Sequence, residues 1–224
     1  MSSIADDVVP QIQLIASDGA PLESLWHFLA IGLLIDCVRH HHRPRTDYFV
    51  AGNMFLYYSK EQARHRDYRG PDFFFVDEVD GGKPRKWWAV WEEDGRYPDF
   101  IMELLSASTA QVDLTTKKRL YERTFRTQEY FCYDPDTHEF KGWRLGDKGR
   151  YQAIAANERG WFWCETLKLW LGLWTGAYMD LPETFPRFYT AQGDLVPTHA
   201  EAEKQRADQL EAELTRLRAQ QTGP

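Results

Sequence analysis

Apolar residues recur at helical spacing near the N-terminus and then give way to short continuous runs of strand length. The helical positions, which follow Pro21, are Leu22, Leu25, Trp26, Leu29, Leu33 and Val38. Because proline suits the first turn of a helix, this spacing predicts a helix over residues 21–40. Apolar and aromatic runs, separated by glycine-containing turns, then predict strands over residues 47–50, 53–58, 72–76, 86–92 and 100–105.

The second half of the chain continues this alternation and ends in a different composition. Serine and threonine at 106–109 predict the start of a helix over 112–126, followed by strands at 129–133, 140–145 and 150–155 and an aromatic segment at 161–174. Pro182, Pro186 and Pro197 predict an exit into a linker. The expected organisation is a loose lead-in (1–19), one α/β domain (20–190), a linker (191–197) and a helical tail (198–224).

The tail carries apolar residues at coiled-coil spacing. Ala207, Leu210, Leu214 and Leu217 follow one another at intervals of three and four residues in a segment rich in Ala, Glu, Gln and Arg. About three heptads are marginal for an isolated helix. Three interpretations stay open: a solvated amphipathic helix, a helix that packs weakly back onto the domain, or a coiled coil that joins two copies of the chain into a homodimer.

Composition limits the class of protein. The chain has 224 residues, 43% of them hydrophobic and 15% aromatic, which suffices for one substantial core. Cys37, Cys132 and Cys164 lack the spacing of a zinc site and are interpreted as reduced core residues. No run reaches the ~20 apolar residues of a membrane span, and the N-terminus lacks the pattern of a signal peptide. We therefore expect a cytoplasmic protein without membrane contact.

The net charge of −7 argues against a generally basic nucleic-acid-binding surface. A nucleic-acid enzyme of this charge must gather its basic residues on one face. Two groups are candidates. The first is Arg39, Arg43 and Arg45 beside a run of histidines, and the second is Lys117, Lys118, Arg119, Arg123 and Arg126.

Two acidic residues adjoin the most apolar strands. Asp72 begins the run at 73–76 and Glu103 lies inside the run at 100–105, where an unpaired carboxylate would be costly to bury. If the two strands are neighbours, both carboxylates can converge on one divalent cation, with the backbone carbonyl of Leu104 as a further oxygen ligand. The sequence therefore predicts a site for Mg²⁺, with Mn²⁺ as a substitute.

The helix at 112–126 offers a lysine to this site. At ~100° per residue, Leu114, Tyr121 and Phe125 share one face of the helix. Lys117 falls inside that arc, whereas Lys118 falls on its edge. A lysine on an inward face requires nearby anions, which the two carboxylates would provide. The alternative is that Lys117 extends outward as a surface residue.

Several motifs in a fixed order resemble a known family. They are Trp26-His27, Asp47, Gly52-Asn53-Met54, Gly70-Pro71-Asp72, the run from Pro98-Asp99 through Glu103 to Ser106, Asp113 with Lys117 and Tyr121, Glu129-Tyr130-Phe131, and Asp134-Pro135. They cover roughly residues 20–175. Together they resemble the bacterial restriction endonuclease-like family, long classed as a domain of unknown function, within the PD-(D/E)XK nuclease superfamily. Leu105 stands where the superfamily pattern places its lysine, and the family carries a relocated lysine on the next helix, here Lys117.

The resemblance implies a restriction-endonuclease-like α/β fold, in which helices flank a central mixed sheet. It also implies a Mg²⁺-dependent endonuclease that hydrolyses DNA phosphodiester bonds. Asp72, Glu103 and the Leu104 carbonyl would hold the ion, and Lys117 would position the attacking water. The alternatives are a non-catalytic nuclease-fold module that binds DNA or regulates another protein, and an RNA-directed or structure-specific nuclease.

Three further residues are candidates for the site. Superfamily members often carry an acidic residue on the first helix, which points to Glu23, and His27 shares its helix face. Asp99 leaves the same strand face as Glu103, but four residues at ~3.3 Å each place the two ~13 Å apart. Asp99 therefore either caps the strand or belongs to a second site.

Overall fold

The computed structural model describes residue 14 and residues 24–64 and 70–221, and it has a central mixed sheet. The strands of this sheet, in spatial order, are β1 (Tyr48–Ala51), β3 (Phe73–Asp77), β5 (Phe100–Leu104), β6 (Glu129–Asp134), β7 (Glu139–Leu145) and β8 (Tyr151–Ala153). β5 and β6 are parallel, and the other neighbouring pairs are antiparallel. The predicted α/β class is confirmed.

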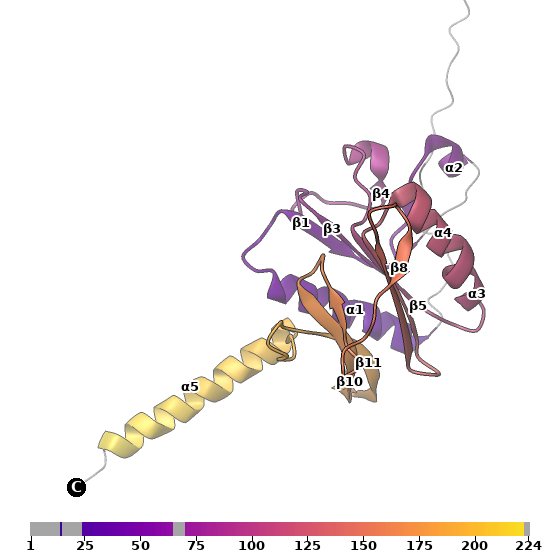
Figure 1. Cartoon of the computed structure of the whole chain (residues 1–224). Helices are drawn as coiled ribbons and strands as arrows, with labels where there is room; N and C mark the ends of the chain where they lie inside the picture. Colours follow the sequence, from indigo (N-terminus) through magenta and orange to yellow (C-terminus); the bar gives the residue numbers. More distant parts are fainter. Residues whose placement is uncertain (1–13, 15–23, 65–69, 222–224) are drawn as a thin grey trace, which may run out of the picture.

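Different elements cover the two faces of this sheet (Figure 1). One face packs against α1 (Leu25–His41) and a second sheet of β9 (Phe162–Cys164), β10 (Leu169–Tyr178) and β11 (Leu181–Tyr189). The other face packs against one helical segment made of α3 (Ala110–Val112), η2 (Asp113–Lys117), α4 (Lys118–Leu120) and η3 (Tyr121–Phe125). Side chains alternate along a strand, so Met102 and Leu104 face α1, whereas Ile101 faces the helical segment.

The predicted helix over 112–126 is present but is not a uniform α-helix. Its stretches η2 and η3 are π-helical, with hydrogen bonds that span five residues. The segment ends at Arg126, which has a left-handed backbone conformation with φ 55°. Such π-helical turns often occur at functional sites, and here they lie on the face of the sheet that carries the acidic residues.

Two predicted strands are much shorter than expected. In place of strands over 53–58 and 86–92, the chain forms β2 (Leu56–Tyr57), paired in parallel with β4 (Trp88–Ala89). α2 (Lys60–Arg64) follows β2, and a 3₁₀ turn, η1 (Val90–Glu92), ends β4. The Trp88 indole donates a hydrogen bond to the Arg96 carbonyl, 2.9 Å away, and stacks on Phe49. The aromatic residues of this region therefore pack into a hydrophobic core and do not lengthen the pairing of β2 with β4.

The prediction that Pro182 and Pro186 lead into a linker is wrong. Both residues lie in β11, opposite Ala177 and Leu173 of β10. β11 is the edge strand of its sheet, where a missing backbone N–H costs no ladder hydrogen bond. The segment 191–197 also packs onto the domain, because Val196 is buried and its N–H donates to the Phe188 carbonyl.

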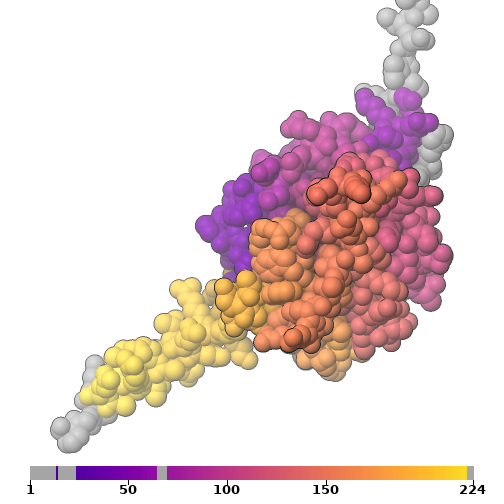
Figure 2. Space-filling view, viewed as in Figure 1, coloured from indigo at the N-terminus to yellow at the C-terminus, as the bar shows by residue number. Residues whose placement is uncertain are grey.

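The tail is a single helix, α5 (His199–Gln221), that is anchored only at its beginning. The buried Arg187 guanidinium forms an ion pair with Glu201 at 2.8 Å, and the His199 N–H donates to Asp36. From residue 203 to residue 220 every side chain is exposed. Figures 1 and 2 show the helix as a rod that extends away from the body.

The three cysteines are free and buried, as predicted. Burial raises the pKa of each thiol, so none is a reactive thiolate at neutral pH. Among the described residues, no helix is long and apolar enough to cross a membrane.

Candidate active site

Strand register places the two predicted carboxylates opposite each other. In the antiparallel pair of β3 and β5, Phe73 faces Met102 and Phe74 faces Ile101, so that Asp72 faces Glu103 one position further on. Asp72 Oδ2 accepts a hydrogen bond of 2.7 Å from the Leu104 N–H, and Glu103 Oε2 accepts one of 3.4 Å from the Asp72 N–H. Both side chains therefore leave the same face of the sheet, beside the Leu104 backbone.

Burial changes the acidity of both groups. Glu103 is fully buried, and burial is the main cause that raises its pKa to about 8, against the opposing effect of Lys117. Asp72 is less enclosed, and burial raises its pKa to about 6, while the hydrogen bond from Leu104 opposes that change. Both groups therefore hold their protons more strongly than free carboxylic acids do, unless a positive charge is added.

Lys117 points into this site from η2. Its Nζ lies 3.2 Å from Glu103 Oε1 and 2.7 Å from Asp113 Oδ1, and its side chain is 18% exposed. Burial favours the neutral amine, but the charges of Glu103 and Asp113 outweigh it and raise the pKa of Lys117 well above its usual value. Lys117 is therefore a fixed cation, suited to donating hydrogen bonds and stabilising negative charge.

Two residues that appear in the sequence motifs without an assigned role complete the site. Asp113 is almost fully buried, and its carboxylate lies beside the Lys117 ammonium. The Tyr121 hydroxyl donates a 2.9 Å hydrogen bond to Glu103 Oε1. The spacing of Asp113 and Lys117 was the available signal, because residues four apart on a helix are neighbours, although such pairs are usually solvated.

The donor set fits a hard cation that retains water ligands. The three carboxyl groups of Asp72, Glu103 and Asp113 lie near one ammonium, so ionising all three creates negative charge that a bound cation would offset. Within the described part of the chain, no group of three or more His, Cys, Asp or Glu side chains is arranged to hold a metal ion. Two carboxylates with a backbone oxygen suit Mg²⁺, which commonly uses one or two carboxylates and keeps several waters.

Two of the additional candidates, Asp99 and His27, do not join this cluster. Asp99 lies at the other end of β5, where its Oδ2 accepts hydrogen bonds from the Asp77 N–H (2.9 Å) and from Arg96 (3.4 Å). His27 lies on α1, which covers the opposite face of the sheet, and its Nδ1 is 2.8 Å from the Ser24 hydroxyl oxygen. Glu23 lies outside the described residues.

Comparison with known proteins assigns the chain to a family. The sequence profile of Uma2, described as a putative restriction endonuclease, matches residues 14–182. The chain belongs to the Uma2 family. This membership confirms the restriction-endonuclease-like assignment and supports nuclease activity in general.

This Uma2-family chain is also similar to proteins of known structure. One is the crystal structure of a putative nuclease belonging to DUF820 from Anabaena variabilis, which matches with a TM-score of 0.48 and 14% sequence identity. The match covers 66% of this chain and 76% of that chain. No protein with a curated description matches the Uma2-family chain.

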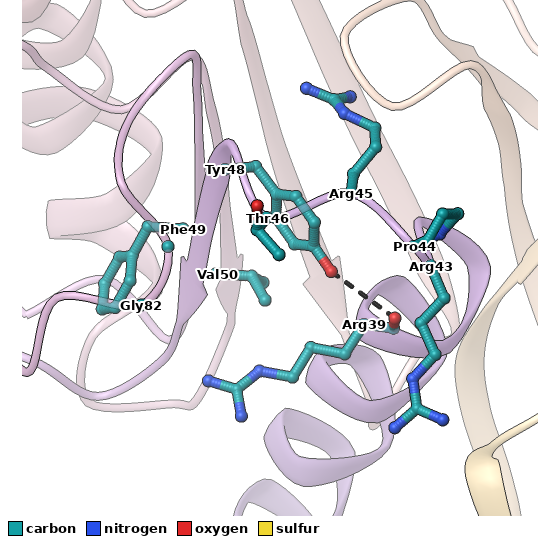
Figure 3. Close-up of a pocket in the computed structure, with 10 residues that line it drawn as sticks. Arg39, Arg43, Pro44, Arg45, Thr46, Tyr48, Phe49, Val50 and Gly82 are labelled. Carbon is teal, nitrogen blue, oxygen red and sulfur yellow. Dashed lines mark hydrogen bonds between the residues drawn. The ribbon is translucent and has the colours of Figure 1, made fainter.

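The first group of basic residues predicted in this Uma2-family chain lies away from the carboxylates. Arg39, Arg43 and Arg45 line a cavity of about 420 Å³ beside β1, at the Asp77 end of the sheet (Figure 3). Their guanidinium groups point in different directions in Figure 3, and Arg45 is already paired with Asp47 and Asp77. This cavity is therefore not a convergent anion site.

The second basic group shares its helical segment with Lys117. Arg119 and Arg123 line a surface hollow of about 410 Å³ with Thr116, Leu120 and Thr124. Lys118 is separate from both the hollow and the carboxylates, because its Nζ lies 3.8 Å from the centre of the Trp143 ring. The predicted difference between Lys117 and Lys118 is thus present in the geometry, whereas the catalytic role of Lys117 stays a prediction.

Proposed function

We propose that this Uma2-family protein is a Mg²⁺-dependent endonuclease that hydrolyses DNA phosphodiester bonds. The observation that carries the proposal is the opposed pair of Asp72 and Glu103 on one face of the sheet, with the Lys117 ammonium 3.2 Å from Glu103. Asp72, Glu103 and the carbonyl of Leu104 are the proposed ligands. When bound, Mg²⁺ would polarise a phosphate oxygen and lower the pKa of a water molecule.

Each side chain of the proposed site then has a separate task. Asp72 is held by the Leu104 N–H and Glu103 by the Tyr121 hydroxyl, so both carboxylates are oriented before any ligand arrives. Lys117 remains protonated, positions the attacking water and stabilises the negative charge that develops on the phosphate. Because Asp113 pairs with Lys117 at 2.7 Å, it fixes where the ammonium can lie. No covalent intermediate on the protein is required.

A nucleic-acid substrate is supported by the placement of basic residues. The chain is acidic overall, so contact with phosphates requires a local concentration of positive charge. Arg119 and Arg123 supply it on the same helical segment that carries Lys117. The proposed path of the phosphate backbone therefore crosses this segment and avoids the arginine cavity beside β1.

Cleavage assays on defined nucleic acids test the proposal. We expect duplex DNA to be cut in the presence of Mg²⁺ or Mn²⁺, and the activity to be lost with a chelator and in Glu103→Gln. Single-stranded DNA and RNA of the same sequence, tested in parallel, identify the preferred substrate. Isothermal titration of Mg²⁺ into wild type and Glu103→Gln provides a readout that is independent of turnover. Metal binding that is unchanged in Glu103→Gln would contradict the proposed ligand set.

A further inference from the structure

The exposed face of α5 carries an apolar seam with no partner among the described residues. Leu210, Leu214 and Leu217 are 58%, 53% and 43% exposed, although leucine is normally buried. With Ala207 they occupy positions 207, 210, 214 and 217, the alternating intervals of three and four that define the a and d positions of a heptad repeat. A helix that extends into solvent with such a seam is suited to a second helix of the same kind.

The charges that flank the seam identify the partner. With Ala207 and Leu214 at a positions, the g positions are Arg206 and Glu213, and the e positions include Glu211 and Arg218. In a parallel pair of identical helices, each g residue faces the e residue five positions later on the other helix. Arg206 then faces Glu211 of the partner subunit, and Glu213 faces Arg218 of the partner subunit. Both pairs are attractive, and two-fold symmetry doubles them.

The antiparallel arrangement of the same seam is disfavoured. Aligning Ala207 with Leu217 and Leu210 with Leu214 keeps the apolar layers but brings g residues opposite g residues and e residues opposite e residues. Glu213 then faces Glu213 of the partner subunit, and Glu211 faces Glu211 of the partner subunit. Like charges in such positions destabilise a pair, so the charge pattern selects the parallel orientation.

The anchor of α5 makes this orientation matter for the whole molecule. The ion pair of Glu201 with the buried Arg187, and the hydrogen bond from the His199 N–H to Asp36, fix the first turn of α5 on the body. We propose that α5 joins two copies of this chain through a parallel, two-stranded coiled coil. Both bodies would then lie at the same end of the rod, whereas an antiparallel pair would hold them at opposite ends.

The first test is the mass of the protein in solution. Sedimentation equilibrium of the full chain, at concentrations from about 1 µM to about 1 mM, should show a reversible monomer–dimer equilibrium, because two leucine-bearing heptads give a weak interface. Leu214→Lys should weaken association by about 10²-fold or more, since it places two like charges in the seam. A protein that ends at residue 204 keeps the Glu201 anchor and should be monomeric, with an unchanged melting temperature. A full chain that remains monomeric throughout, or forms trimers, would overturn the proposal.

A charge-exchange series tests the register. Glu211→Lys places a lysine opposite Arg206 of the partner subunit and should weaken the dimer by about tenfold, and adding Arg206→Glu should restore it. Asp208→Lys is the matched control, because it makes the same change of charge on the same exposed helix but away from the seam. Equal weakening by Asp208→Lys and Glu211→Lys, or no rescue in the double variant, would contradict the specific g-to-e pairing.

The orientation has its own readout. In a parallel pair Ala207 lies beside Ala207 of the partner subunit, so Ala207→Cys should form a disulfide-linked dimer under mild oxidation. Ala212→Cys, on the outer side of the helix, is the control, and the native cysteines are buried and do not interfere. Failure of Ala207→Cys to cross-link in a protein that is dimeric by sedimentation would exclude the parallel arrangement.

Discussion

The two ends of the β3–β5 pair carry carboxylates in very different surroundings. At one end, Glu103 and Asp113 both pair with the Lys117 ammonium, and the Asp72 carboxyl group is close enough to affect the pKa of Lys117. At the other end, Asp77 is paired with Arg45, and Asp99 accepts hydrogen bonds from the Asp77 N–H and from Arg96. At the second end Asp77 and Asp99 each have an arginine of their own, whereas at the first end three buried or partly buried carboxylates have one ammonium between them.

This contrast shows which property identifies a candidate site. Burial raises the pKa of Asp99 as well as the pKa values of Asp72 and Glu103, so a shifted pKa alone does not separate the two ends. The number of cations for each enclosed carboxylate does. At the Asp77 end the carboxylates in excess of the arginines, Asp47 and Glu78, are largely exposed to solvent, whereas at the other end Glu103 and Asp113 are buried with one ammonium. A buried group of carboxylates that outnumbers its cations can bind a metal ion.

The largest expected effect is on the cleavage rate, when a carboxylate is neutralised at the Glu103 end and, as a control, at the Asp99 end. Glu103→Gln should reduce cleavage by about 10³-fold or more, because it removes a proposed metal ligand. Asp99→Asn makes the same loss of charge on the other end of the same strand and should leave the cleavage rate within a few-fold of wild type while lowering the melting temperature. Plasmid cleavage and thermal melts measure both quantities. Similar losses of activity in both variants would remove the distinction between the ends.

The next effect separates two adjacent lysines. Lys117→Met should lower cleavage by about 10²-fold with little change in DNA affinity, because it removes a positioned charge from the site. Lys118 packs on the Trp143 ring, so Lys118→Met should change the rate by only a few-fold. Single-turnover rates and DNA titrations at several salt concentrations provide the comparison. If the two variants weaken DNA binding to the same extent and have similar cleavage rates, the helical segment is only a basic surface.

The pH dependence of stability provides a third test, of several degrees in melting temperature. The folded protein holds protons on Asp72 and Glu103, with pKa values of about 6 and about 8, where the unfolded chain has released them. Their contribution to the free energy of unfolding is therefore present at low pH and is lost as pH rises through this range. In the metal-free protein, wild type should lose more stability than Glu103→Gln between about pH 5 and about pH 8.

The same proton linkage predicts the effect of metal. Mg²⁺ requires ionised ligands, so it should raise the melting temperature of wild type more at pH 8 than at pH 5, and its binding should release protons. Glu103→Gln should show little stabilisation at either pH. Calorimetry in buffers with different ionisation enthalpies counts the protons. Stabilisation by Mg²⁺ that is independent of pH would place the metal elsewhere.

The smallest expected effect concerns orientation within the carboxylate-rich end. Tyr121→Phe removes the hydroxyl that holds Glu103 and should slow cleavage by about 3- to 10-fold, the value of one hydrogen bond. Tyr130→Phe is the matched control, because its hydroxyl donates to the backbone carbonyl of Asp113 and not to a proposed ligand. The control should change stability more than rate. An unchanged rate in Tyr121→Phe would show that Glu103 is held adequately by other contacts.

Much of the sheet could be predicted because its strands are continuous apolar runs. The runs at 73–76 and 100–105 predicted β3 and β5. Asp72, beside the first run, and Glu103, within the second, stood out as the acidic residues of these apolar segments. Regular 100° spacing also placed Lys117 on the inner face of its helix, although parts of that helix are π-helical. Leu114 and Tyr121 are only seven residues apart, so the departure of the π-helical stretch from α-helical spacing adds up to a small angle between them.

The parts that could not be predicted depend on partners distant in sequence. From the sequence alone, Asp113 and Lys117 resemble an ordinary solvated pair four residues apart on a helix. Asp113 is buried because the helical segment packs against the sheet. Pro182 and Pro186 are compatible with a strand only at the edge of a sheet, and the sequence does not reveal which strand is outermost. Pairing of β2 with β4 likewise joins segments about thirty residues apart and leaves little local pattern.

The π-helical stretches of η2 and η3 decide which single-residue deletions this segment can absorb. A stretch whose hydrogen bonds span five residues contains one residue more than the α-helical path requires. Loss of the Thr115 codon within η2 removes that extra residue, so the segment can become α-helical while its later residues keep their orientation. Loss of one codon within α4, which has no extra residue, rotates the later residues by about 100° and turns the Tyr121 hydroxyl away from Glu103. Of two neighbouring in-frame deletions, the one in α4 is therefore expected to disturb the site more.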